Sequence, residues 1–267
     1  MKIYLAGVYS RPYCLKESMK IYLAGNAPWK EDQIYNKLII DNKPNILESY
    51  YYTRNGSGWI DELKQYFNDF MLDSGAFTFM NNLKTEIDWN LYVEQYADFI
   101  NKYNIDKFIE LDIDIVVGLK EVEKLRNKLE KLTNKKCIPV WHRTRGKDYW
   151  NRITKEYNYV AIGGFAIKTI RQNDYKYISW FLDIAKQNKC KVHGLGFTNL
   201  EGLKKYKFYS VDSTAWIYGN RAGFIYIFNG NTMIKKKVDG KRLKGKEAAI
   251  HNFSEWIKFQ KYAEKNL

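Results

Sequence analysis

The sequence predicts an α/β fold, a single (β/α)8 TIM-type barrel that accounts for all 267 residues. Short apolar runs alternate with amphipathic segments along most of the chain, which is typical of βαβ units and a parallel sheet. The runs are continuously apolar, as in strands buried on both faces. About eight of them within roughly 190 residues favours a closed barrel. An open, flavodoxin-like sheet is the competing fold.

The predicted strands span residues 20–25, 46–52, 70–73, 108–112, 138–142, 159–163, 192–196 and 209–212. The first of them lies in a repeat, because the heptapeptide MKIYLAG at 1–7 recurs at 19–25. We expect only one copy to sit in the barrel. A local duplication and a second start codon at Met19 are both open explanations of the repeat.

Amphipathic segments between these strands predict helices. Residues 86–103 place Trp89, Tyr92, Tyr96 and Phe99 on one face, at spacings of three and four. Residues 118–132 and 175–187 show the same periodicity. A closing helix is predicted over 248–263, so the whole chain reads as one domain.

The net charge is +14, from 44 basic and 30 acidic residues. A positive excess of this size favours a polyanionic partner, with nucleic acid as the first candidate. Aromatic residues make up 16% of the chain and can stack on bases. A lysine-rich surface without a partner is the alternative.

The basic residues are concentrated near the C-terminus. Residues 233–246 carry seven basic side chains against one acid, Asp239. This basic C-terminal segment is the strongest local candidate for phosphate contact, and an exposed solubilising loop is the alternative.

Three cysteines, Cys14, Cys137 and Cys190, lie far apart and form neither a disulfide framework nor a CxxC zinc pair. We therefore expect a cytoplasmic protein that needs no metal and no cofactor. No run approaches the roughly 20 apolar residues of a membrane span, so we expect no membrane association.

Polar residues gather where the predicted strands end. The strand-end motifs are DSGAF (73–77), ELDID (110–114), PVWHR (139–143), AIGGF (161–165), HGLGF (193–197) and SVDST (210–214). In a parallel barrel these ends meet on one rim, where active sites are built. An aspartate after a strand also commonly caps the next helix, but several converging on one rim favour a site.

Carboxylates and glycines of this kind suit chemistry at a nucleobase. A carboxylate can attack or stabilise the positive sugar C1′ as a base leaves, as in retaining glycosidases. A second carboxylate can transfer protons. A third can accept hydrogen bonds from purine N–H groups, while a glycine pair lets a flat base edge approach the backbone.

The six motifs, in this order over about 140 residues, resemble those of the tRNA-guanine transglycosylase family. The resemblance covers roughly residues 46–223 and is closest to the phage and bacterial members that put 7-deazaguanine bases into DNA. It implies a nucleic-acid base-exchange enzyme that cleaves an N-glycosidic bond and inserts a 7-deazaguanine-type base. It implies the family's barrel as well.

Under this resemblance Asp212 matches the nucleophile that forms a covalent sugar–enzyme intermediate. Asp73 matches the carboxylate credited with proton transfer. Asp112 matches the acid that reads the base edge, with Asp114 as a rival two residues along the same strand face.

The base pocket has further matches. Gly163 and Gly164 match the pair that binds the base carbonyl, and Gly194 and Gly196 would open space beside it. His142 falls where the family has Gln, which leaves the base preference open.

The residues expected to contact nucleic acid are basic and lie after the fifth predicted strand or downstream of Asp212. They are Arg143, Arg221, Lys235, Lys236, Lys237, Lys241 and Arg242.

The chain departs from the family in one respect. The zinc-binding appendix, built on three cysteines and a histidine, is absent, because no cysteine follows Cys190. Since that appendix helps to bind tRNA and to form the family's dimer, we expect DNA rather than tRNA as the partner. We also expect a free 7-deazaguanine-type base as co-substrate, and a monomer or a dimer unlike the family's.

Three other functions stay open. A DNA glycosylase of the same fold would use water as acceptor and leave an abasic site, for example in phage defence. A catalytically inactive nucleic-acid-binding barrel and a hydrolase of small nucleosides are the remaining alternatives.

Overall fold

The structure is a computed structural model that describes residues 18–25, 32–56, 58–75, 78, 87–217, 223–237 and 245–267. Seven parallel strands form one curved sheet in the order β3-β2-β1-β7-β6-β5-β4. They are β1 Lys20–Ala24, β2 Asn45–Ser49, β3 Asp69–Asp73, β4 Val140–Trp141, β5 Tyr159–Ile162, β6 Lys191–Gly194 and β7 Ser210–Ser213.

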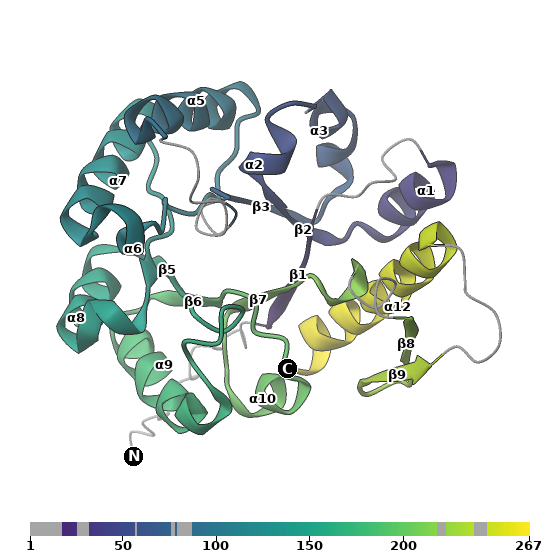
Figure 1. Ribbon diagram of the computed structural model, residues 1–267. Coiled ribbons are helices and arrows are strands. Elements are labelled where there is room, and N and C mark those ends of the chain that lie inside the picture. Colours follow the sequence, from purple (N-terminus) through teal and green to yellow (C-terminus); the bar gives the residue numbers. More distant parts are fainter. Residues whose placement is uncertain are drawn as a thin grey trace, which may run out of the picture.

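The segment 107–110 closes this sheet between β3 and β4. Phe108 forms a parallel bridge with Leu72 on one side, and Ile109 forms one with Ile138 on the other. Eight chain segments therefore follow one another around a ring in sequence order, which is the topology of a TIM-type barrel (Figure 1). The open-sheet alternative is wrong.

Helices surround the barrel (Figure 1). The α-helices are α1 Gln33–Asn42, α2 Tyr50–Thr53, α3 Gly58–Leu63, α5 Trp89–Lys102, α6 Asp114–Val117, α7 Leu119–Thr133, α8 Gly146–Glu156, α9 Ile178–Gln187, α10 Leu200–Lys205 and α12 Gly245–Asn266. Short 3-10 helices are η1 Lys64–Tyr66, η2 Arg143–Arg145 and η3 Gln172–Tyr177. Side chains of Asp32 and Asp88 accept from the first N–H groups of α1 and α5 and fix where those helices begin.

The core has two shells, because successive strand residues point to opposite faces. The barrel interior is filled by residues such as Tyr22, Leu47, Met71, Ile109 and Tyr159. The alternate residues face outward and pack against the helices in a larger cluster. Polar side chains join this interior shell at the carboxyl ends of the strands, where Asp73 and Asp212 lie.

Three predicted strands differ clearly from those observed. One of them, predicted over 138–142, is reduced to β4, Val140–Trp141. The strand predicted over 46–52 ends at Ser49, and Tyr50 begins helix α2. The ring of Tyr50 packs against those of Tyr92, Tyr96 and Phe99, so aromatic packing on α5 turns the chain away from the sheet. The strand predicted over 108–112 makes only single bridges, because the chain leaves the sheet before Asp112.

Two predicted helices also differ. The segment 175–187 is divided into η3 and α9, which meet at Tyr177 and Ile178. The closing helix predicted over 248–263 is longer, since α12 runs from Gly245 to Asn266.

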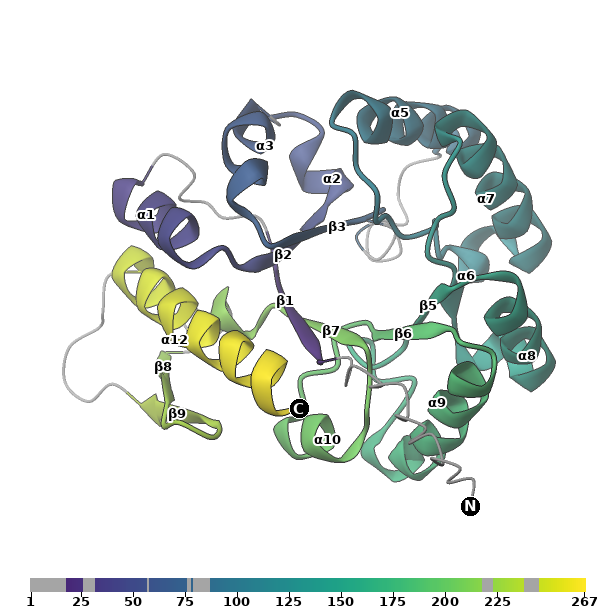
Figure 2. The same cartoon turned by 180° about the vertical axis from the view of Figure 1, so that it is seen from behind.

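The basic segment is a strand where it is described. Met233–Lys237 forms β9, which pairs with β8 Phe224–Phe228 in an antiparallel hairpin. Helix α12 separates this hairpin from the barrel: Gln260 Nε2 donates to Asn45 O at 3.0 Å, while Asn252 Oδ1 accepts from Tyr226 N at 2.8 Å. Figures 1 and 2 both show the hairpin on the outer side of α12.

The second copy of the repeat forms β1, and the copy at 1–7 lies outside the described residues. In the described part of the chain, no helix combines the length and apolar character that a membrane span requires.

Candidate active site at the barrel rim

Three predicted aspartates lie together at the carboxyl ends of the strands. Asp73 ends β3, Asp112 follows the bridging segment, and Asp212 lies in β7. Asp112 and Asp212 are both close enough for their charges to raise the pKa of Asp73. The rim therefore holds a cluster of three carboxylates where barrel active sites are built.

Asp212 is buried, and one of its oxygens is anchored. Its Oδ1 accepts from the backbone N–H of Gly196 at 2.6 Å and lies 3.2 Å from Nε2 of His193. Gly196 adopts φ of +68°, a left-handed conformation that favours glycine and turns this N–H toward the carboxylate. No described residue hydrogen-bonds Oδ2.

A chain of hydrogen bonds leads inward from Asp212. His193 Nδ1 lies 2.6 Å from Ser210 Oγ, and Ser210 Oγ lies 2.5 Å from the hydroxyl of Tyr159. Burial raises the pKa of Tyr159, so its hydroxyl stays a donor. With Tyr159 donating to Ser210 and Ser210 to Nδ1, Nε2–H of His193 donates to Asp212.

Asp73 holds its proton unusually tightly. Burial raises the pKa of Asp73 to about 7, and the negative charges of Asp112 and Asp212 add to the effect. The N–H of Gly75 donates to Asp73 Oδ2 at 2.9 Å and opposes it. A carboxyl group with this pKa can both give and take a proton near neutral pH.

Asp112 is paired with His142 across the rim. The distance from Asp112 Oδ2 to His142 Nε2 is 2.9 Å, and both side chains are largely buried. The imidazole lies over Gly163, where a Cβ would come within 2.4 Å of Cε1. Gly163 therefore makes room for His142, and its own N–H donates to Trp141 O within the sheet.

Asp114 lies apart from this cluster. It is the first residue of α6 rather than part of a strand, and its Oδ1 accepts from Arg145 Nη2 at 2.8 Å. Arg145 also donates to Glu110 Oε1 at 2.6 Å. The placement on the same strand face as Asp112 is wrong, because the chain has already left the sheet and the buried Arg145 takes up the carboxylate.

The other glycines divide between the rim and the outer layer. Gly196 touches Asp212, as described. Gly164 faces Thr169 and Ile170, and Gly194 faces Phe197 and Phe208 in the outer shell. The structure thus places Gly163 and Gly196 at the site. At Gly164 and Gly194 the position that a side chain would occupy faces other residues, away from the site.

The predicted phosphate contacts are dispersed. Arg143 is exposed beside His142 at the rim. Lys235, Lys236 and Lys237 are exposed on β9, beyond α12. Arg221, Lys241 and Arg242 lie outside the described residues.

Sequence reasoning missed how His193 is used. His193 and His142 could have served together as zinc ligands on the rim, but each histidine is paired with a different aspartate. No three His, Cys, Asp or Glu side chains group around a metal position in the described ranges. The sequence did carry a signal, because His193 opens the HGLGF motif and Asp212 lies in the SVDST motif that follows it.

No family model matches this chain, and no curated protein matches it significantly. Among solved structures it is similar to a putative fructose-1,6-biphosphate aldolase from Coccidioides immitis, with 9% identity and a TM-score of 0.56 over 93% of this chain and 90% of that one. The aldolase QR15 has 11% identity and a TM-score of 0.48 over 76% and 92%. The carboxyl transferase domain of Rhizobium etli pyruvate carboxylase with 3-bromopyruvate has 12% identity and a TM-score of 0.48 over 94% and 48%. The likeness to the Coccidioides immitis structure, at this identity, shows the barrel fold alone.

Proposed function

We propose that this chain cleaves the N-glycosidic bond of a nucleotide in a nucleic acid and installs a 7-deazaguanine-type base in place of the one released. The observation that carries the proposal is that two neighbouring carboxylates, Asp212 and Asp73, have different hydrogen-bonding and electrostatic environments. Asp212 has one oxygen anchored by Gly196 and His193, while the pKa of Asp73 is raised to about 7 beside it. Carboxylates whose environments differ in this way divide the roles of nucleophile and acid.

In the first step Asp212 Oδ2 attacks C1′ of the sugar, and the bond from C1′ to the base nitrogen breaks. The bonding electrons move onto the base, and Asp73 supplies the proton that the departing base takes up. In the second step the ionised Asp73 removes an N–H proton from the incoming base, whose nitrogen attacks C1′ and releases Asp212.

The Asp112–His142 pair supports recognition of the base. Asp112 can accept from purine N–H groups, and His142 fixes its orientation from the next strand. The motif order that resembles the transglycosylases and the net charge of +14 support a nucleic-acid substrate. With no zinc appendix in the sequence, the proposed substrate is DNA.

The test is mass spectrometry of nucleosides from DNA and from tRNA incubated with the protein, with and without free 7-deazaguanine-type bases. The expected result is a new nucleoside in DNA only when the free base is present. Asp212→Asn should abolish it, while Asp106→Asn, a surface carboxylate paired with Lys135, should not.

Two outcomes would overturn the proposal. Wild-type activity in Asp212→Asn would remove the nucleophile. Released base with abasic sites, and no incorporation of the free base, would make water the acceptor and the protein a glycosylase.

A further inference from the structure

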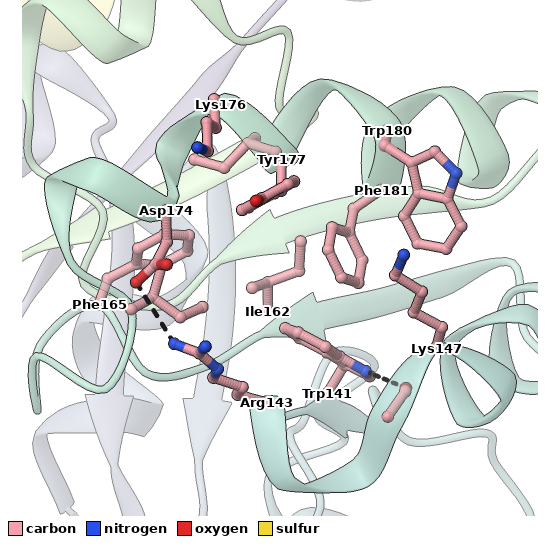
Figure 3. Close-up of a pocket in the computed structure, with 13 residues that line it drawn as sticks. Trp141, Arg143, Lys147, Ile162, Phe165, Asp174, Lys176, Tyr177, Trp180 and Phe181 are labelled. Carbon is pink, nitrogen blue, oxygen red and sulfur yellow. Dashed lines mark hydrogen bonds and ion pairs between the residues drawn. The ribbon is translucent and has the colours of Figure 1, made fainter.

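A cleft lies outside the barrel wall, where the ends of β4 and β5 face the starts of α8 and α9 (Figure 3). It has a volume of about 530 Å³, within the range of small-molecule pockets. Its walls are mainly apolar and are formed by Trp141, Ile162, Phe165, Ile178, Trp180 and Phe181.

A second, polar basin adjoins this cleft and has a volume of about 520 Å³. Arg143 and Asp174 line both, and they form an ion pair of 3.5 Å between Nη1 and Oδ2. The remaining lining residues of the basin are Lys168, Thr169, Arg171 and Asn173. Cleft and basin are thus two compartments of one site, the first aromatic and the second polar.

The charge of this site is positive. Asp174 is the one carboxylate among the described lining residues, against five basic side chains. Two of these lie over aromatic rings, with Lys147 Nζ 5.1 Å from the ring of Trp180 and Lys176 Nζ 5.1 Å from that of Tyr177. An aromatic compartment beside a cationic one complements a ligand with a flat ring and an anionic group.

The site begins at the catalytic rim. Arg143 directly follows His142, and consecutive Cα atoms are about 3.8 Å apart. Phe165 likewise comes two residues after Gly163, over which the His142 ring lies. The site therefore adjoins the rim at two points of the chain, His142–Arg143 and Gly163–Phe165.

We propose that cleft and basin together bind one nucleotide of the nucleic-acid strand, the neighbour of the nucleotide whose base is displaced. Its base lies against Trp180 in the cleft, and its phosphate lies among Arg143, Lys168 and Arg171 in the basin. The assignment of this nucleotide as a neighbour rests on the proposed function. The site itself is defined by its own lining residues.

The experiment measures binding of two fluorescent single-stranded oligonucleotides, one of mixed sequence and one with the same phosphates but no bases. Lys168→Glu with Arg171→Glu should weaken both, roughly tenfold or more, and flatten the dependence of log affinity on log salt by about 0.7 for each phosphate that is no longer neutralised. Lys120→Glu with Lys131→Glu on α7 makes the same charge change at residues that line neither the cleft nor the basin, and it should have little effect.

Trp180→Ala tests the base compartment separately. It should weaken binding of the mixed-sequence strand roughly fivefold or more, because stacking on one ring is removed, and leave the base-free strand unchanged. Trp180→Phe retains a ring and should restore most of the affinity. Melting temperatures near wild type show that these variants are folded.

Three results would overturn the inference. Equal effects of Trp180→Ala on both oligonucleotides would mean that no base enters the cleft. If Lys168→Glu with Arg171→Glu binds both oligonucleotides as tightly as the α7 control variant does, no phosphate lies in the basin. Binding of a free nucleoside monophosphate as tight as that of the strand would make this a free-nucleotide site.

Failure here is distinguishable from failure of the proposed function. If nucleoside analysis shows Asp212-dependent base exchange while these variants bind normally, only the neighbouring-nucleotide site falls. If the variants lose binding but no glycosidic bond is cleaved, only the proposed chemistry falls.

Discussion

His193 Nε2 lies 3.2 Å from Oδ1 of Asp212. The two residues lie on neighbouring parallel strands, where His193 is in register with Ser210, two residues before Asp212. The histidine therefore holds the carboxylate from inside the barrel, and the Gly196 N–H holds the same oxygen from the rim. Such double anchoring fixes the direction in which Oδ2 points.

The first prediction concerns His193 as a positioning residue. His193→Phe keeps a buried ring but removes the donor, so we expect the rate of turnover to fall by roughly 10²-fold, as for a misplaced reacting group. KM should change little, because His193 does not reach the substrate. Steady-state kinetics on a nucleic-acid substrate check this split.

Tyr159→Phe is the matched control, since it removes only the last hydroxyl of the hydrogen-bond chain, the one farthest from Asp212, and leaves the ring in place. Its loss of activity should be much smaller. If His193→Phe instead raised KM and left kcat unchanged, the positioning role would be refuted.

The second prediction uses the raised pKa of Asp73. The folded protein holds this proton up to about pH 7, whereas the unfolded chain releases it near the ordinary value of 3.8. Stability from this group is thus full below about pH 4 and is lost as the pH rises through about 7. Asp73→Asn removes that loss, so its free energy of unfolding should gain on wild type by roughly 2.5 kcal/mol between pH 5 and pH 8, out of about 4 kcal/mol for the whole pKa shift. Melting temperatures of both proteins across this pH range check it.

The same variant should lose at least about 10²-fold in activity, as expected for a missing acid–base group. Glu48→Gln is the control, because burial raises the pKa of Glu48 to about 8 on the outer side of β2, whereas Asp73 faces the barrel interior. It should show the same pH-dependent gain in stability with activity retained. An Asp73→Asn protein that stays active would leave Asp73 with a capping role only.

The barrel could be predicted from sequence because its strands are apolar and short, and the helices between them are periodic. The prediction failed where tertiary packing decides the outcome. The sequence pattern predicts Tyr50 in a strand, but its ring packs against the aromatic rings of α5 and the residue begins helix α2. The basic segment has the composition of a loop, yet its first residues pair with β8.

The site was predictable to the level of strand ends. Asp73, Asp112, His142 and Asp212 all end apolar runs, and parallel topology alone brings them together. The pairings were not predictable, since they depend on which strands are neighbours and on where each strand stops. Asp114 shows this best. The chain begins helix α6 at this residue, so its carboxylate pairs with Arg145 and does not join the carboxylates at the rim.

The third prediction tests the close packing of His142 on Gly163. A Cβ at this position would lie 2.4 Å from the imidazole, so Gly163→Ala must displace His142 from Asp112. We expect weaker binding of the base and a lower kcat/KM, with the chain still folded. Gly58→Ala is the control, because its Cβ would meet nothing within 4 Å. Equal kinetics for the two variants would show that the Asp112–His142 pair is not needed.

The last prediction concerns the basic hairpin. Lys235, Lys236 and Lys237 are exposed on β9, and α12 separates them from the barrel. If they track a phosphate backbone, reversing all three to Glu should weaken DNA binding and reduce the salt slope by about 0.7 to 0.9 for each phosphate that they neutralise. Base release from a small nucleoside should be unchanged, because the hairpin does not reach Asp212.

Lys120, Lys131 and Lys155, on α7 and α8, provide a control reversal of equal charge. Since the hairpin and the basin at Arg143 lie on different elements, their effects on the salt slope should add when both are reversed. A hairpin variant that binds DNA as the control does would make β9 a solvated surface. Equal activity on free nucleosides and on DNA, with no dependence on salt, would shift the substrate to small nucleosides.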